Sequence, residues 1–208
     1  MNLKAFLRNY AAPVSKDHGL VRSGSDFKLT SSSGSTAILF FEEIRVDSRK
    51  VVFGVSYCVI PAVYWDWVTR YDGDTARPAG RSGAFVTRFI LPPEGLSYDP
   101  EDDGYFRRMW SYGAGMEQEC GSALRECLTD EVIPEMARML DLGSLLAELR
   151  NPTRPGVSSL SQDLCEIFVG IETMPSEKLD QALAEAERNG AARSLISWIR
   201  QHSQAGSQ

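Results

Sequence analysis

The feature that most constrains the fold is the ten-residue run Val51–Ile60. In an extended chain, successive side chains point to opposite faces, and β-branched and aromatic residues favour strands. Large residues fall on one face and mostly smaller ones on the other: Val51, Phe53, Val55, Tyr57 and Val59 against Val52, Gly54, Ser56, Cys58 and Ile60. The run predicts a central strand that is packed unequally on its two sides.

Three further strands are predicted around this one, at Asp26–Thr30, Thr36–Glu43 and Ala84–Leu91. Turn residues separate the first two, at Ser31–Gly34, and a loop rich in Gly, Pro, Asp and Arg, Asp72–Gly83, precedes the last. Parallel strands need long crossover connections, which are absent between these segments. We therefore expect an antiparallel sheet of about four strands.

Helical periodicity dominates the rest of the chain. An amphipathic helix is predicted over Asn2–Ala12 and ended by Pro13, and the helical period returns from Met116 onward. Pro134 suits the first turn of a following helix, Ser176 suits a helix N-cap, and Gly190 suits a helix end. The fold class is therefore predicted as α+β: an N-terminal helix, the antiparallel sheet, then an all-helical C-terminal half.

The expected organisation is an α+β domain over residues 1–150 and a docked helical segment over residues 157–203. The turn-rich segment Asn151–Gly156 between them is the predicted linker, and residues 204–208 are a predicted disordered tail.

Composition narrows the class of protein. The 208-residue chain has a formal net charge of -6, which gives nucleic acid no overall attraction. No apolar run reaches the roughly 20 residues that a membrane helix needs, and the N-terminus reads as a helix rather than a signal peptide. Four cysteines without close pairing, Cys58, Cys120, Cys127 and Cys165, indicate buried thiols. We expect a cytoplasmic protein without a nucleic-acid or membrane partner.

Catalytic signatures are missing from the sequence. It contains no G-x-S-x-G, and its two histidines, His18 and His202, lie near opposite ends, where we expect both to be solvated. Ser25 and Lys28 match S-x-x-K by letter but enter a strand. Asp99–Gly104 matches the first half of a calcium loop, yet Trp110 stands where the bidentate glutamate belongs. The sequence indicates no catalytic residues, no metal ligands and no cofactor.

The most distinctive local feature is an aromatic turn that follows the central strand. A candidate binding surface combines it with arginines and a tryptophan further along: Tyr64, Trp65, Asp66, Trp67, Arg70, Tyr71, Arg88, Arg107 and Trp110. Aromatic residues and arginine often anchor protein interfaces. The alternative is structural, with Tyr64, Trp65 and Val68 covering the end of the sheet.

Several segments occur together in an order found in a known family: Gly19–Phe27, Phe53–Pro61, Trp65–Trp67, the region of Trp110, Val132–Pro134 and Leu142–Arg150. In this respect residues 1–155 resemble the bacterial family called domain of unknown function 4304, especially its actinobacterial members. The family has no assigned activity. The resemblance implies a bacterial, intracellular α+β protein.

Two functions are compatible with these observations. The first is a non-enzymatic protein-interaction or immunity-like accessory factor that binds a protein partner through acidic loops and exposed aromatics. The alternative is a small-ligand-binding protein or an enzyme that uses loop carboxylates and arginines, for example Glu42, Asp66, Arg88 and Arg107, since carboxylates alone can perform acid–base catalysis. The sequence leaves the partner and the oligomeric state open.

Overall fold

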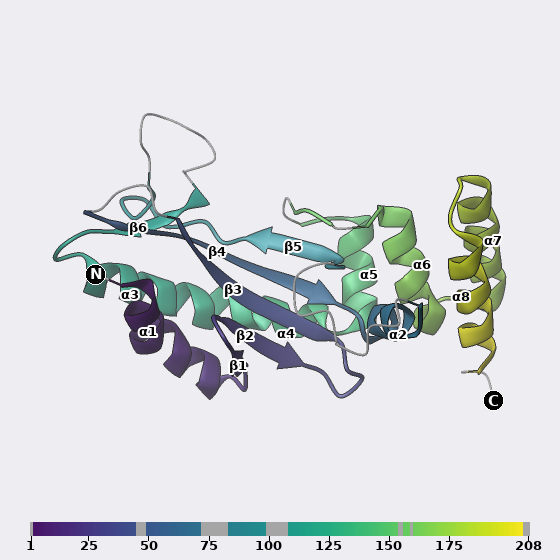
Figure 1. Cartoon of the computed structure of the whole chain (residues 1–208), viewed down its shortest axis with the longest axis horizontal. Helices are drawn as coiled ribbons and strands as arrows, with labels where there is room; N and C mark the ends of the chain where they lie inside the picture. Colours follow the sequence, from purple (N-terminus) through teal and green to yellow (C-terminus); the bar gives the residue numbers. More distant parts are fainter. Residues whose placement is uncertain are drawn as a thin grey trace. The chain divides into compact units, whose positions relative to one another are not determined.

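The computed structural model describes residues 2–44, 49–71, 83–98, 108–153, 156–158 and 160–205, with the backbone alone at residues 69–71 and 204–205. Within them the predicted α+β class is confirmed: an N-terminal helix, an antiparallel sheet and a helical C-terminal half (Figure 1). The described part of the chain contains no helix that is long and apolar enough to cross a membrane.

The sheet has six strands in the described residues, ordered β1-β2-β3-β4-β5, and β6 also pairs with β4. Their bounds are β1 Val21–Ser23, β2 Asp26–Thr30, β3 Thr36–Ile44, β4 Val51–Ile60, β5 Val86–Phe89 and β6 Trp110–Tyr112. The prediction of a central strand at β4 is confirmed. The expected number of about four strands was too low, because β1 and β6 are each three residues long and too short to show alternation.

The helices lie close to where periodicity predicted them. They are α1 Leu3–Asp17, α2 Ala62–Tyr71, α3 Glu117–Cys127, the π-helical η2 Leu128–Val132, α4 Ile133–Met139, α5 Leu142–Arg150, α6 Gln162–Thr173, α7 Ser176–Arg188 and α8 Arg193–Ala205. Gly190 lies just beyond α7 with φ at 89°, as a helix end favours. The N-cap of α7 is Pro175, so the prediction of Ser176 at this position was wrong by one residue.

The chain forms two compact units. The first comprises Met1–Thr30, Ala37–Cys58 and Thr87–Ala137, and the second comprises Ser31–Thr36, Val59–Val86 and Arg138–Gln208. The predicted linker does not coincide with this division, since α5 and α6 on either side of it belong to the second unit. Each unit therefore combines segments that are far apart in the sequence.

An aromatic cluster forms the core of the first unit. The ring of Phe6 in α1 stacks on Tyr112 of β6 at 4.6 Å and tilts against Phe53 of β4 at 5.4 Å. Trp110 is fully buried and opposite Phe53 in the β4–β6 ladder, and its Nε1 donates to the carbonyl of Ile90 at 2.8 Å. The short strand β6, which periodicity missed, therefore supplies two of the largest core side chains.

α1 continues past the helix end that was predicted from the sequence. Proline removes a backbone donor and costs about 3 kcal/mol inside a helix, so Pro13 was predicted to terminate α1. Instead Pro13 lies inside α1, exposed to solvent, and the next residues, Val14 and Ser15, are buried. Burial of an apolar side chain such as valine contributes about 1.5–3 kcal/mol, which offsets much of the cost. Tertiary packing overrides the local preference here.

Pro134 occupies the first turn of α4, as predicted. However, α4 is not a separate helix that begins there. α3 runs through η2 into α4, and the N–H of Ile133 donates to the carbonyl of Leu128, the wider bond of a π-helix. Pro134 has no N–H to donate. The widened turn directly before it accommodates the missing bond without ending the helix.

α1 and α3 lie side by side on one face of the sheet, and their packing depends on Gly121 (Figure 1). Gly121 of α3 is buried, and a Cβ atom at this position would overlap the ring of Tyr10 in α1. We predict that Gly121→Ala lowers the free energy of unfolding by about 1–3 kcal/mol through overpacking. This loss outweighs the gain of up to roughly 1 kcal/mol in helix propensity.

Urea denaturation followed by circular dichroism measures this effect. Ser122→Ala, at the exposed neighbouring position, is the matched control and should stay within about 0.5 kcal/mol of the native chain. Tyr10→Ala should relieve the penalty of Gly121→Ala in the double variant. A Gly121→Ala chain more stable than the native one would contradict this packing.

Candidate functional site

The aromatic turn forms the helix α2, and its side chains pack into the second unit. The ring of Tyr64 lies edge-on to Phe85 at 5.5 Å and to Phe168 of α6 at 5.4 Å. Phe85 and Phe168 are both almost fully buried. Tyr64 and Trp65 are themselves half-buried. Tyr64 therefore serves the core, as the structural alternative expected, while Asp66 on the same helix is exposed.

Trp67 joins the same core from the next turn of α2. Its ring meets Trp198 of α8 at 5.5 Å and 63°, and Trp198 is 3% exposed. The ring of His202, one turn further along α8, stacks on Trp198 at 4.7 Å and 18°. His202 was expected to be solvated, but it lies within α8, which continues to Ala205, and it is half-buried. His18 is exposed, as expected.

The remaining residues of the predicted binding surface do not complete it. Trp110 is fully buried and Arg88 is 5% exposed, so neither contributes to an exposed surface. They lie in β6 and β5. The side chains of Arg70 and Tyr71, and the whole of Arg107, lie outside the described residues, as does the calcium-loop match at Asp99–Gly104. Pairing with β4 turns Trp110 inward, which sequence spacing could not reveal.

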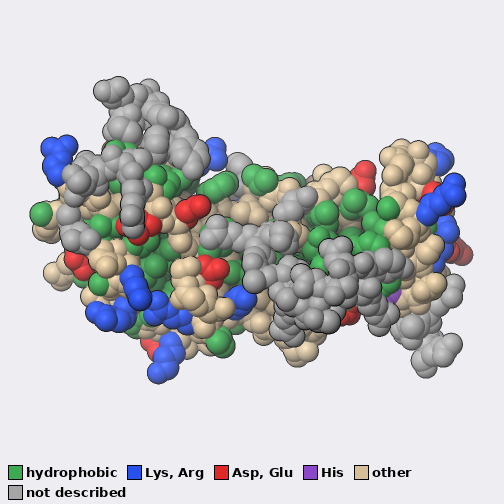
Figure 2. Space-filling view, viewed as in Figure 1, with side chains coloured by type: hydrophobic (Ala, Val, Ile, Leu, Met, Phe, Trp, Pro, Cys, Tyr) green, Lys and Arg blue, Asp and Glu red, His purple; other side chains and the backbone are tan. Residues whose placement is uncertain are grey.

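A groove of about 720 Å³ lies in the second unit. Its walls come from α5, α6, α7 and the turns that flank α7. The apolar lining includes Leu146, Leu164, Ile167, Met174, Ala182 and Ala186. Figure 2 shows hydrophobic side chains gathered over α5 and α6, beside the column of α7 and α8. Sequence reasoning did not find this site, although the small Ala182 and Ala186 on one face of α7 are its signal.

The polar side chains of the groove are mostly occupied by local structure. Ser161 Oγ accepts from the N–H of Leu164, which caps α6, and Thr173 Oγ1 donates to the carbonyl of Val169 at 2.9 Å. Arg150 Nε donates to Glu166 Oε2 at 2.9 Å in an ion pair. Gln162 Nε2 donates to the other oxygen of Glu166 at 3.2 Å. The hydroxyl of Ser161 caps α6 and that of Thr173 bonds back within the same helix, so both are committed to the helix backbone.

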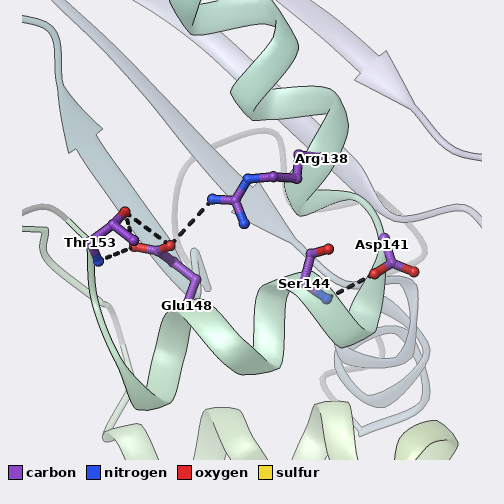
Figure 3. Close-up of polar contacts among 5 residues, drawn as sticks. All are labelled: Arg138, Asp141, Ser144, Glu148 and Thr153. Carbon is purple, nitrogen blue, oxygen red and sulfur yellow. Dashed lines mark hydrogen bonds and ion pairs between the residues drawn. The ribbon is translucent and has the colours of Figure 1, made fainter.

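A buried carboxylate fixes α5, the helix that forms one wall of the groove. Figure 3 shows Glu148 between Arg138 and Thr153. Its side chain is 2% exposed and accepts from the N–H of Thr153 at 2.8 Å, from the Thr153 hydroxyl, and from Arg138 Nη2 at 3.2 Å. A buried charge is tolerated when hydrogen bonds satisfy it. This network therefore ties the end of α4 and the chain after α5 to one point.

The start of α5 is fixed by Asp141. Its Oδ1 accepts from the N–H of Ser144 at 2.8 Å, the standard geometry of an N-cap (Figure 3). The backbone N–H and the side chain of Ser144 hold the pKa of the Asp141 carboxyl below its ordinary value. Both ends of α5 are thus anchored, which gives the groove a rigid wall.

The cysteines are free, and Cys58, Cys120 and Cys165 are buried, as predicted, while Cys127 is half-buried. Burial raises the pKa of the Cys120 thiol to about 12, with a smaller contribution from the charge of Glu119. Burial likewise raises the pKa of Cys165 to about 11, although Ser158 Oγ lies 3.3 Å from its sulfur. Only the thiolate is a strong nucleophile, so these thiols are inert at neutral pH. Among the described residues, no group of three or more His, Cys, Asp and Glu side chains is arranged to hold a metal ion.

Comparison of the chain with protein-family models, with curated protein sequences and with solved structures finds no match. The resemblance to the family named above is therefore carried by sequence segments alone and stays a prediction.

The Glu148 network yields a stability prediction. We expect Arg138→Ala to lower the free energy of unfolding by about 1.5–3 kcal/mol, because it removes a hydrogen bond to a buried carboxylate. Arg193→Ala, at an exposed position of α8, is the control and should change stability by less than about 0.5 kcal/mol. Equal stability of Arg138→Ala and the native chain in urea denaturation would contradict this account.

The thiols yield a reactivity prediction. At about pH 8, near the ordinary pKa of cysteine, we expect Cys127 to react with a thiol-specific chromogenic disulfide and the other cysteines to stay protected. In concentrated guanidinium chloride all of them should react. Absorbance gives the number of reactive thiols, and peptide mapping identifies them. Rapid labelling of Cys120 or Cys165 in the folded chain would contradict the burial of these groups.

Proposed function

We propose that this protein is a non-enzymatic protein-interaction factor, of an immunity-like or accessory type, that binds its partner through the groove between α5, α6 and α7. The observation that carries the proposal is an apolar floor whose neighbouring hydroxyls are committed to helix backbones. The floor includes Leu146 and Leu164, which are half-buried and keep part of their surface open to a ligand. Burial of such apolar surface is the main favourable term in protein association.

Two further features support binding over catalysis. The buried thiols of Cys120 and Cys165 have raised pKa values and do not serve as nucleophiles at neutral pH. Of the carboxylates and arginines named for an enzyme, Arg88 is buried and Asp66 is exposed, while Arg107 lies outside the described residues. On the resemblance of its segments, we also propose a bacterial, cytoplasmic protein related to the family named above, without a nucleic-acid partner.

A second candidate function is the binding of a small apolar ligand. The groove volume of about 720 Å³ falls within the roughly 300–1,000 Å³ typical of small-molecule sites. The two candidate functions differ in the size of the molecule that occupies the groove. Native mass spectrometry of the purified chain distinguishes the two, since a retained small ligand adds a discrete mass.

A pair of variants on α7 tests the proposed function. Ala182 lines the groove and is half-buried, whereas Ala184, two residues on, is exposed and does not line it. We expect Ala182→Arg to reduce capture of the partner by at least about tenfold, because a charged side chain in the apolar floor costs well over 1.4 kcal/mol. Ala184→Arg carries the same charge change and should leave capture unchanged.

The measurement uses the immobilised full chain, a lysate of the source organism and quantitative mass spectrometry of the captured proteins. Circular dichroism and melting temperature must agree among the three chains, so that loss of capture reports on the groove. Capture that depends on Ala182 but not on Ala184 supports the proposal. Capture by Ala182→Arg at the native level would overturn it.

A further inference from the structure

The groove has two chemically different ends. α6 and α7 are joined by the turn at Met174–Pro175, and Figure 1 shows them running in opposite directions from it. One end of the groove, the turn end, is lined by Thr173, Met174, Pro175 and Lys178. At the other, the far end, lie the first turn of α6 with Asp163 and the last turn of α7 with Glu185.

The charges that line the two ends differ in sign. Lys178 is the cation of the turn end, and Asp163 and Glu185 are anions of the far end. These three side chains are exposed and make no ion pair with another described residue. Arg150, which also lines the groove, is neutralised by Glu166 at 2.9 Å. The groove thus carries a positive end and a negative end separated by an apolar floor.

Helix dipoles do not set this polarity. A helix carries partial positive charge at its N-terminus and partial negative charge at its C-terminus. Because α6 and α7 run in opposite directions, each groove end lies beside one terminus of each sign. The dipoles largely cancel, so the side chains of Lys178, Asp163 and Glu185 decide the field that an occupant meets.

The walls of the groove favour a helical occupant over an extended one. An extended peptide gains affinity by pairing its backbone with the open edge of a sheet. Here the walls are helices, whose backbone groups are already paired within each helix. An α-helix satisfies its own backbone and needs only an apolar stripe to fill such a groove. α7 has 13 residues and is about 20 Å long, which matches an occupant helix of three to four turns.

From these observations we infer that the groove binds an amphipathic helix of a partner protein, with basic residues of that helix at the far end and acidic residues at the turn end. The inference rests on the proposed function and adds the chemistry and orientation of the partner segment. Its apolar stripe would contact Leu146, Leu164 and Ile167.

A synthetic probe tests the inference on the full chain. The probe is an amphipathic peptide held helical by a solvent-facing lactam bridge, with two lysines in its first turn and two glutamates in its last. It carries a fluorophore and a benzophenone beside the lysines. We expect saturable binding by fluorescence anisotropy, with photo-crosslinks in residues 185–191. A probe with glutamate at both ends should bind at least about fivefold more weakly at low salt, and the difference should shrink as screening increases.

Two charge-swapped chains make the test specific. Lys178→Glu with Glu185→Lys keeps the net charge and weakens or reverses the groove polarity, so crosslinks should shift toward residues 173–178. Asp180→Lys with Arg188→Glu also keeps the net charge, at exposed positions of α7 outside the groove lining, and should leave the crosslinks in place.

The outcomes separate the two proposals. Absence of saturable binding by any probe overturns both this inference and the helical form of the proposed interaction, while the Ala182 and Ala184 comparison still decides whether the groove binds a protein at all. Binding with crosslinks that do not respond to the Lys178 and Glu185 swap overturns the orientation alone. Equal affinity for the probe with glutamate at both ends also overturns the charge complementarity.

Discussion

β4 pairs with β3 along one edge and with β5 and β6 along the other, and all of its residues except Gly54 are buried. A strand this apolar is stable only if both of its faces are covered and its backbone groups are paired. β6 pairs with the backbone of β4 beside Phe53. The rings of Phe6 and Tyr112 help to cover one face of the strand. The first unit is therefore organised around the burial of β4.

The second unit is organised around α6 in the same way as the first is organised around β4. Its Phe168 contacts Tyr64, Phe85 and Trp198, so rings from distant parts of the sequence meet on one helix. α5 is held beside α6 by caps and by the buried Glu148, whose carboxylate is satisfied by Arg138 and Thr153. On the other side, α7 presents alanines where larger side chains would fill the space. The groove is what remains between a fixed wall and a wall of small residues.

Several polar side chains of the groove form hydrogen bonds and ion pairs within its walls, and this determines which groups are left for an occupant. Ser161 and Thr173 bond to the backbone, and Arg150 and Glu166 neutralise one another, so these groups hold the walls in shape. The apolar floor and the separated charges of Lys178, Asp163 and Glu185 are what an occupant would contact. The binding that we propose would therefore come from burial of apolar surface and be oriented by charge.

Long periodic segments were predictable from the sequence, and short ones were not. β4 shows its alternation over ten residues, and the stripes of α3 and α5 show theirs over several turns, so a local pattern was enough. β6 has three residues, and its place in the sheet depends on pairing with β4. Pro13 broke a local rule because burial of Val14 offsets the cost. Of the candidate binding residues, the sequence identified the aromatic character of α2 but not which way its rings face.

By itself, the sequence determined the α+β class, the central strand, the helical second half and the acidic charge, because these depend on residue type and period along the chain. The tertiary structure decided that Trp110 is buried, that the half-buried Tyr64 and Trp67 pack against buried rings, and that the groove lies beside α7. The physical reason is that the exposure of a side chain depends on contacts with residues far away in the sequence, as between Trp67 and Trp198. Local propensity carries no information about where such partners meet.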